Sequence, residues 1–368
     1  MTPLTTAPSR AEQRWIAAES AAQARRARQL AVAQLALAPR RARGILEFLS
    51  RVQSRGLHVD GETRRVLSPD ELPVRPRGAV RVMAEAHAAA RPHLERYLNR
   101  DARWRALALP GFARGLRFKM LSLDATSGAC SLKLALGARF RQDGGFSRSA
   151  LELYVLSGSL ELGRHRHGAG SYLYVPRGVA LPELRSARGA EALAFYNDGP
   201  PSLVPSDSDH PDGERLGLSA IDAHQDLAWR PPGEQPADAP GVLVKLLRTD
   251  PVTGACTRLV AWPPQFRRDA VGFRDSGEET YQLRGTLTTL QFGDLPTGGY
   301  CWRPAFVNHG PLAASQGALA FSRTDGEPVL HFQASPWTTP QENRRRAREA
   351  LEARRPALFA VTDPGRRR

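Results

Sequence analysis

A long internal repeat constrains the fold of this chain more than any other feature of the sequence. Residues 115–130 return as residues 241–256 at a constant offset of 126, ending in Gly-Ala-Cys both times. The similarity continues in three further pairs of segments: 154–158 and 281–285, 170–176 and 298–304, and 192–195 and 318–321. A repeat of this length indicates one fold unit present twice. Every difference between the copies then becomes evidence about function.

Short alternating runs with glycine-rich punctuation follow residue 115, a pattern typical of β-sandwiches and β-barrels. Strong helix formers fill residues 9–56, where Pro39 predicts a break between two helices, and residues 78–99 predict another helix. We therefore expect five segments: an Arg- and Ala-rich helical region (1–110), a first β domain (111–200), a Pro-rich linker (201–240), a second β domain (241–334) and a basic C-terminal helix with its tail (335–368).

The net charge of +15 lies outside the two repeats. Residues 1–110 hold 20 arginines against 10 acidic residues, and residues 341–368 hold 9 against 4. Basic flanks can bind an acidic protein or RNA, but without interleaved aromatic residues or a nucleic-acid motif we expect solvated helical faces instead. Three cysteines without a CxxC pair suit a reducing compartment, and no stretch is long and apolar enough to cross a membrane. We expect a cytoplasmic protein.

The glycine and proline positions of both repeats resemble the cupin family. Tyr154 to Gly158 and Gly170 to Gly178 carry the likeness in the first copy, with Gly298-x5-Pro304 in the second. The resemblance implies a mainly β fold of two tandem cupin-type double-stranded β-helix (jelly-roll) barrels, a bicupin, with an N-terminal α-helical region. Cupins use three histidines and one glutamate of two motifs as metal ligands, so the resemblance also implies where ligands would lie.

The first copy has lost all of these motif ligands. Its glutamate position is Leu151, its second-motif histidine position is Leu181, and its upstream histidine positions fall on Gly145 and Ser147. Alternate residues of a strand share a face, so Leu151, Leu153 and Val155 would point inward together. The sequence thus predicts a filled, apolar interior for the first barrel.

The second copy retains polar residues at the same positions. Glu278 occupies the glutamate position and His309 the second-motif histidine position, while Arg274 replaces an upstream histidine. The inward face of this strand would carry Glu278, Thr280 and Gln282. We take Glu278 and His309 as candidate catalytic residues or metal ligands. The candidate substrate-binding residues are Arg274, Thr280, Tyr281 and Gln282.

Three interpretations of this second site remain open. Glu278 and His309 could bind a divalent transition metal such as Fe, Mn, Zn or Ni, with Asp275, Glu279 or His331 as further ligands. They could instead line a metal-free pocket, in which Arg274 binds a carboxylate or phosphate. They could also be a structural polar core.

The corresponding functions are a cupin enzyme of the dioxygenase or isomerase kind, a non-catalytic ligand-binding or regulatory protein, and an interaction protein acting through its basic flanks. We expect a small polar or anionic ligand, no membrane partner, no nucleic acid unless the flanks bind RNA, and a homodimer.

Overall fold

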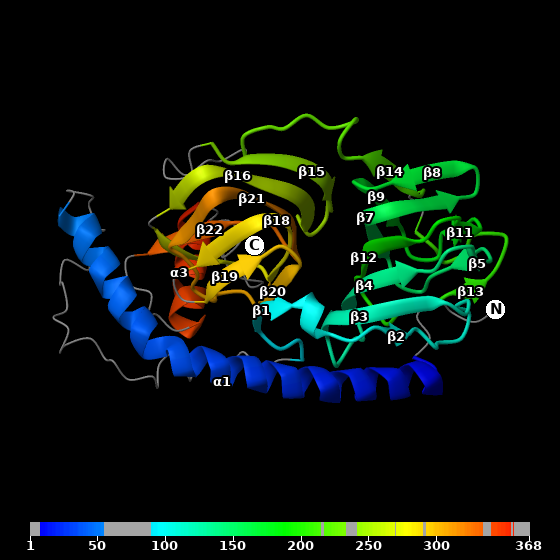
Figure 1. Cartoon of the computed structure of the whole chain (residues 1–368), viewed down its shortest axis with the longest axis horizontal. Helices are drawn as coiled ribbons and strands as arrows, with labels where there is room; N and C mark the ends of the chain where they lie inside the picture. Colours follow the sequence, from blue (N-terminus) through cyan, green and yellow to red (C-terminus); the bar gives the residue numbers. More distant parts are fainter. Residues whose placement is uncertain are drawn as a thin grey trace, which may run out of the picture.

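The computed structural model describes residues 8–54, 90–214, 217–232, 241–268, 270–289, 292–333, 340–354 and 356. The chain is mainly β, as predicted, and its two repeats form two neighbouring β units with a long helix along one side (Figure 1). We call residues 115–200 repeat 1 and residues 241–330 repeat 2.

Repeat 1 is built on a large antiparallel sheet with the order β14-β9-β7-β12-β4-β3-β2, to which β8, β11 and β5 attach, beside a small β10-β6-β13 sheet. The strands and their bounds are β2 (Arg105–Ala106), β3 (Leu116–Leu123), β4 (Cys130–Leu136), β5 (Phe140–Gln142), β6 (Gly145–Phe146), β7 (Leu151–Leu162), β8 (His165–Gly168), β9 (Ser171–Val175), β10 (Ala180–Leu181), β11 (Leu184–Ser186), β12 (Ala190–Tyr196), β13 (Val204–Pro205) and β14 (Ser219–Asp222).

Repeat 2 has a sheet with the order β1-β20-β18-β21-β16-β15, with β19 on β18, and a separate β17–β22 pair. Its strands are β1 (Leu94–Leu98), β15 (Leu243–Thr249), β16 (Cys256–Arg268), β17 (Val271–Arg274), β18 (Glu278–Thr289), β19 (Gly293–Pro296), β20 (Gly299–Arg303), β21 (Leu312–Thr324) and β22 (Leu330–Gln333). The order β20-β18-β21-β16-β15 matches β9-β7-β12-β4-β3 of repeat 1 strand for strand. The sequence repeat is therefore a structural repeat.

The two repeats exchange edge strands. β1 precedes repeat 1 in the sequence but pairs with β20 of repeat 2, and β14 precedes repeat 2 but pairs with β9 of repeat 1. Two of the three lysines reinforce this exchange, because Lys119 donates to the backbone carbonyl of Asn99 and Lys245 to that of Ala223. Each repeat is thus held at its edge by a segment that leads into the other.

The helix predicted over residues 78–99 is wrong at its C-terminal end, where the structure has strand β1. Residues up to 89 of that prediction lie outside the described residues, but Leu94–Leu98 is a strand followed by a short 3-10 helix (Asn99–Asp101). Pairing with β20, about 200 residues further along the chain, overrides the local helix propensity because it buries Leu94 and Tyr97 against repeat 2.

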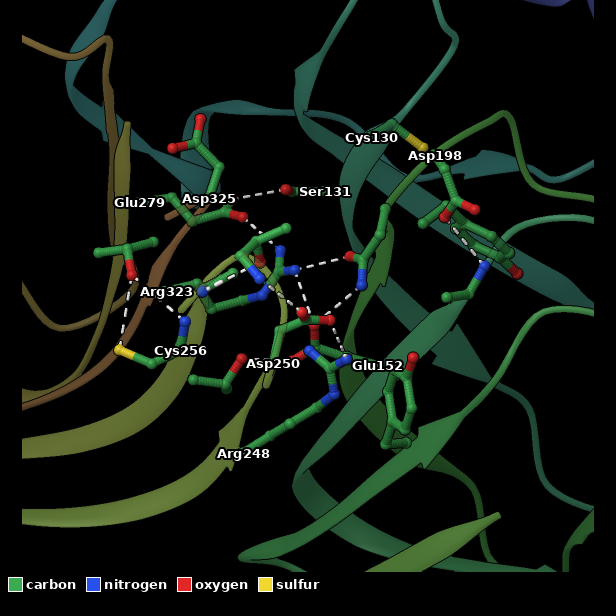
Figure 2. A pocket seen from close by; sticks show the side chains of 18 of the residues that line it. Cys130, Ser131, Glu152, Asp198, Arg248, Asp250, Cys256, Glu279, Arg323 and Asp325 are labelled. Atoms are coloured by element: carbon green, nitrogen blue, oxygen red, sulfur yellow. Dashed lines mark hydrogen bonds and ion pairs between the residues drawn. The ribbon is translucent and has the colours of Figure 1, made fainter. Parts of the chain in front are cut away.

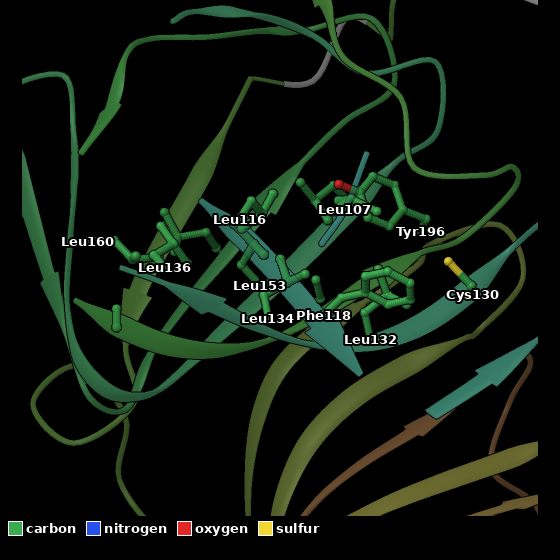
Figure 3. Packing of buried hydrophobic residues seen from close by; sticks show 14 of the residues in the cluster. Leu107, Leu116, Phe118, Cys130, Leu132, Leu134, Leu136, Leu153, Leu160 and Tyr196 are labelled. Carbon is green, nitrogen blue, oxygen red and sulfur yellow. The ribbon is translucent and has the colours of Figure 1, made fainter. Parts of the chain in front are cut away.

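Each central strand uses both faces. In β7, Leu151, Leu153 and Val155 are buried in the apolar interior of repeat 1, which Figure 3 shows around Leu132, Leu134 and Phe118. The intervening Tyr154 faces repeat 2 and packs 5.0 Å from Phe321, measured between ring centroids. The period of two along a strand therefore separates an interior face from an inter-repeat face.

Two helices flank the β units. Helix α1 (Arg10–Ser54) continues through Pro39, so one helix is present where two were predicted. Buried Glu12 and Glu19 pair with Arg148 and Arg105, and thereby attach α1 to repeat 1. Helix α3 (Pro340–Arg354) follows repeat 2. The segment predicted as a linker, 201–240, contributes β13 and β14 to the sheets of repeat 1.

Candidate functional site

Repeat 2 contains a cavity of about 810 Å³ where repeat 1 has a packed apolar interior. Side chains of β15, β16, β18, β20 and β21, together with the β17–β22 pair and Ala350 of α3, line this cavity. Its volume falls within the range of sites for small organic molecules. We call it the repeat 2 cavity.

Glu278 lies at the centre of the charged part of this cavity. Its carboxylate is 3.1 Å from Nε of Arg274, 3.8 Å from Nη1 of Arg303 and 4.0 Å from Nε2 of His309. Burial alone would raise the pKa of Glu278, but nearby positive charge, led by Arg274, outweighs it and lowers the pKa to about 2. Glu278 is therefore ionised at neutral pH.

His309 is neutral at the same pH. Burial, followed by repulsion from Arg303, lowers the pKa of His309 to about 3, despite the attraction of Glu278. Its Nδ1 lies 3.2 Å from the carbonyl oxygen of Val307. Because a carbonyl only accepts hydrogen bonds, Nδ1 carries the ring proton. Nε2, the ring nitrogen 4.0 Å from Glu278, keeps its lone pair.

Glu95 on the exchanged strand β1 orients the side chain of Arg303. Its guanidinium donates from Nε and Nη2 to both carboxylate oxygens of Glu95, a bidentate pair with an Nη2–Oε2 distance of 3.0 Å. Glu95 also interacts with Nε2 of His93 at 2.9 Å. A bidentate pair fixes the plane of the guanidinium, so β1 positions a cation at the wall of the cavity.

Arg258 is poorly compensated in the cavity. Its Nε is buried without a hydrogen-bond partner. Burial, followed by repulsion from Arg274, lowers the pKa of the guanidinium, which means that the surroundings disfavour its positive charge even with Glu278 nearby. Arg274 is better satisfied, because its Nη1 donates to the carbonyl of Pro328 at 2.7 Å. Arg258 thus retains hydrogen-bonding capacity for a ligand.

Repeat 1 has apolar residues at the corresponding positions. Leu132 corresponds to Arg258, Leu151 to Glu278 and Val175 to Arg303, and all three are buried in the apolar cluster of repeat 1. Two aromatic residues of that cluster are also missing from repeat 2, where Val244 replaces Phe118 and Ser322 replaces Tyr196. The cavity therefore coincides with introduced charge and with the loss of Phe118 and Tyr196, although Trp262 lines it where repeat 1 has Leu136.

The structure brings together four of the six predicted site residues. Glu278, Thr280, Arg274 and His309 line the cavity, but Tyr281 points to the opposite face of β18. Its hydroxyl accepts a hydrogen bond from Asn99 between the repeats, because neighbouring strand residues alternate in direction.

Gln282 is fully buried and is not among the residues that line the cavity. Its Nε2 donates to the backbone carbonyls of Arg284 and Leu319. The residues that sequence analysis missed are Arg258, Arg268 and Arg303. Extending the repeat comparison two residues beyond Cys256 would have exposed the change from Leu132 to Arg258.

The additional metal ligands considered from sequence do not gather at the cavity centre. Glu279 lies on the inter-repeat face, and Asp275 pairs with His331 at 2.5 Å. Within the described ranges, no group of three or more His, Cys, Asp or Glu side chains is arranged to hold a metal ion. Glu278 and His309 supply only two donors among several arginines, so this donor set does not fit a resident divalent metal.

A second, smaller cavity of about 330 Å³ lies between the repeats, and Figure 2 shows its polar lining. Glu152 of repeat 1 accepts hydrogen bonds from Tyr172 at 2.8 Å and from Thr257 of repeat 2 at 2.5 Å. The equivalent Glu279 accepts from Tyr300 at 2.7 Å and from Ser131 of repeat 1 at 2.5 Å. In each repeat, a glutamate thus accepts one hydrogen bond from a tyrosine of its own repeat and one from a hydroxyl group of the other repeat.

Arg323 joins the two halves of this arrangement. Its Nη2 lies 2.8 Å from Glu152 and its Nη1 lies 2.5 Å from Glu279, while Arg91 approaches Glu279 at 3.0 Å. Burial would raise the pKa of both glutamates, but the neighbouring arginines outweigh it and lower both values. Since the carboxylates are fully partnered, we interpret this network as the connection between the repeats rather than as a ligand site.

The fold is that of the cupins, to which the strand order and the comparison with solved structures both point. The chain is similar to a "putative dioxygenase" from Nostoc punctiforme PCC 73102, with a TM-score of 0.59 and 22% identity over 67% of this chain and 87% of the other. It is less similar to oxalate decarboxylase from Bacillus subtilis, with a TM-score of 0.43 and 13% identity over 65% of this chain and 79% of the other.

The chain belongs to the family described as Domain of unknown function (DUF4437), whose model matches residues 98–330. This match covers both repeats and the end of β1. No curated protein matches the sequence. None of the helices in the described part of the chain has the length and hydrophobicity that a membrane span requires.

Proposed function

We propose that the chain is a bicupin whose second barrel binds a small organic anion through arginine side chains, without a resident metal. The observation that carries this proposal is Arg258, a half-buried side chain whose buried Nε has no hydrogen-bond partner inside a cavity, where repeat 1 has a leucine. An anion bound there would complete the hydrogen bonds of Arg258 and neutralise its repulsion with Arg274. Buried polar groups left unpaired in the free protein often serve a ligand.

The charge of the cavity also supports an anion rather than a cation. Arg258, Arg268, Arg274 and Arg303 line it, while Glu278 is the one buried carboxylate among its described lining residues. A divalent metal would meet this excess of positive charge, and no group of three or more His, Cys, Asp or Glu side chains in the described part of the chain is arranged to hold it. An organic acid would meet guanidinium groups, which suit carboxylates in geometry and charge.

Isothermal titration calorimetry with inorganic phosphate, succinate, benzoate and hexanoate, at constant ionic strength, tests the proposal. We expect at least one anion to bind wild type at one site per chain, and Arg258→Leu, which installs the residue of repeat 1, to weaken it at least tenfold. Arg284→Leu is the matched control because Arg284 is exposed on β18, away from the cavity. No binding of any anion, or equal binding by Arg258→Leu, would overturn the proposal.

Elemental analysis of untagged protein tests the metal-free part separately. We expect no stoichiometric iron, manganese, zinc, nickel or copper. A near-stoichiometric metal that is lost from His309→Leu would establish a metal site and contradict this part of the proposal.

A second candidate function is proton transfer on the bound anion. The supporting observation is that His309 keeps a lone pair on Nε2 next to ionised Glu278. Nε2 would remove a proton from the carbon beside a carbonyl group, the arginines would stabilise the resulting enolate, and Glu278 would stabilise the imidazolium until the proton returns to carbon. Binding of an anion would itself raise the pKa of His309, because it neutralises the arginines.

Deuterium exchange tests this second function. We expect wild type in D₂O to accelerate exchange at C3 of 2-oxobutanoate, followed by NMR, and His309→Leu to lose the acceleration while Arg284→Leu keeps it. Exchange at the buffer rate in wild type would remove this candidate and leave a binding protein. Binding of an acidic partner or RNA by the basic flanks, homodimer formation and a cytoplasmic location stay predictions.

A further inference from the structure

The repeat 2 cavity is polar at one end, and the strand register shows which residues share that end. Arg258 on β16 pairs with Ser322 on β21, which in turn pairs with Thr280 on β18. Glu278 lies beside Arg303 in the next row toward the beginning of β18. These two rows form a band of charged and hydroxyl side chains across four neighbouring strands, β20, β18, β21 and β16.

An apolar band begins one row further along the same strands. Val260, two residues after Arg258, pairs with Val244 on β15 and with Ala320 on β21. The following row places Trp262 opposite Ala318. Val244, Val260 and Trp262 line the cavity together with Val242, Leu287 and Leu312. The cavity therefore continues from its charged end along an apolar wall, and Arg268, which pairs with Leu312, follows at the end of β16.

Space along this wall exists because repeat 2 lacks an aromatic residue that fills repeat 1. Phe118, which is fully buried in repeat 1 and labelled in Figure 3, corresponds to Val244. A valine in its place leaves volume next to Val260 that other side chains do not fill. A bare inorganic anion would occupy only the arginine end of a cavity of about 810 Å³.

We propose that the ligand of repeat 2 is an amphiphilic organic acid, with its carboxylate at Arg258, Arg274 and Arg303 and an apolar body along Val244, Val260 and Trp262. This inference rests on the proposed anion-binding function and adds the chemical class of the ligand. The arginines fix the head, and burial of the body removes apolar surface of both ligand and protein from water.

A chain-length series tests the inference directly. We would titrate the protein with linear monocarboxylates from butanoate to dodecanoate by calorimetry, with decan-1-ol as the uncharged comparison. We expect the affinity to rise about fourfold for each methylene group that the apolar wall buries, and then to stop rising when the cavity is full. Decan-1-ol should bind at least tenfold more weakly than decanoate, because it lacks the charge that the arginines recognise.

Two cavity variants locate the body of the ligand. Val244→Phe, which installs the residue of repeat 1, should move the end of the rise to a shorter carboxylate. Trp262→Leu installs the residue that repeat 1 has at the corresponding position, Leu136, and should move the end of the rise to a longer carboxylate. This second variant tests the inference even if Val244→Phe does not fold. Val252→Phe is the matched control, because Val252 is 90% exposed and lies outside the cavity.

The outcomes separate this inference from the proposed function. Equal affinity for short and long carboxylates, or a cut-off that neither cavity variant moves, would overturn the amphiphilic ligand while leaving the anion site intact. Failure of every carboxylate and of phosphate to bind would overturn both.

Discussion

Replacement of Arg258 by leucine should make the protein more stable while removing its proposed ligand binding. Arg258 carries a buried Nε without a hydrogen-bond partner, and its positive charge is disfavoured first by burial and then by Arg274. An unsatisfied buried donor is unfavourable by about 1–3 kcal/mol, and loss of the attraction to Glu278 offsets part of the gain on its removal. Leucine fills no new space, because it is smaller than arginine, but it gives this wall the apolar side chain that Leu132 provides in repeat 1.

We therefore expect Arg258→Leu to raise the free energy of unfolding by about 1–2 kcal/mol, which corresponds to roughly 1–3 °C in Tm for a chain of 368 residues. Thermal unfolding followed by circular dichroism, in phosphate-free buffer without small carboxylates, measures this shift. The buffer matters because a bound anion would stabilise wild type selectively. Arg284→Leu should change Tm by less than 1 °C, since surface substitutions usually have effects within about 0.5 kcal/mol.

A variant less stable than wild type by 1 kcal/mol or more would refute the reasoning. It would mean that the protein itself compensates the charge of Arg258, so that the guanidinium is a structural group and not one held ready for a ligand. The combination of higher stability and lost binding would be the expected signature of a functional residue in a strained setting.

Three further perturbations probe the charges around this site and between the repeats. Glu278→Leu should lower stability by about 3–5 kcal/mol in urea unfolding, because it leaves buried arginines without their carboxylate, and an unchanged midpoint would contradict the central role of Glu278. Arg323→Met should lower stability by a similar ~3–5 kcal/mol, since two buried glutamates lose their shared partner; a loss below 1 kcal/mol would show that the network is dispensable. For His309, the pKa is about 3 in the folded protein against an ordinary 6.5, so the unfolded chain binds the extra proton between these values. Stability should therefore fall as the pH drops from about 6.5 toward 3. His309→Leu should flatten the fall in Tm between pH 6.5 and 5, and an undiminished slope would assign it to other groups.

The sequence predicted the charged core of the site because motif spacing transfers to strand register. Glu278 and His309 were located by counting from glycines and prolines, and the structure brings their side chains within 4.0 Å. The prediction that Tyr281 binds substrate was wrong, because its neighbour Thr280 occupies the cavity face of β18 and Tyr281 therefore points to the opposite face. Arg303 was missed for a different reason: its orientation depends on Glu95, and no local pattern indicates that residues about 200 positions apart form a bidentate pair.

Contacts between residues distant in the sequence also explain why parts of the fold were predicted wrongly. Residues 94–98 form a strand only because β20 offers them an edge, and β14 leaves the predicted linker for the corresponding edge of β9. Such pairings depend on how the repeats pack, which periodicity within one segment does not encode. The repeat itself held more of this information, since Lys119 and Lys245 occupy equivalent positions and make equivalent contacts with the exchanged segments.

The asymmetry between the repeats divides stability from ligand recognition. Repeat 1 fills its interior with leucine, valine and aromatic residues, whereas repeat 2 gives up that packing for arginines and a cavity. A cavity with partly unpaired charges lowers the stability of the unit that contains it. The exchanged strands, the stacked Phe195 and Phe321 and the Arg323 network attach that unit to a well-packed partner. Repeat 2 can therefore keep a polar interior because much of its stability comes from contacts outside that interior.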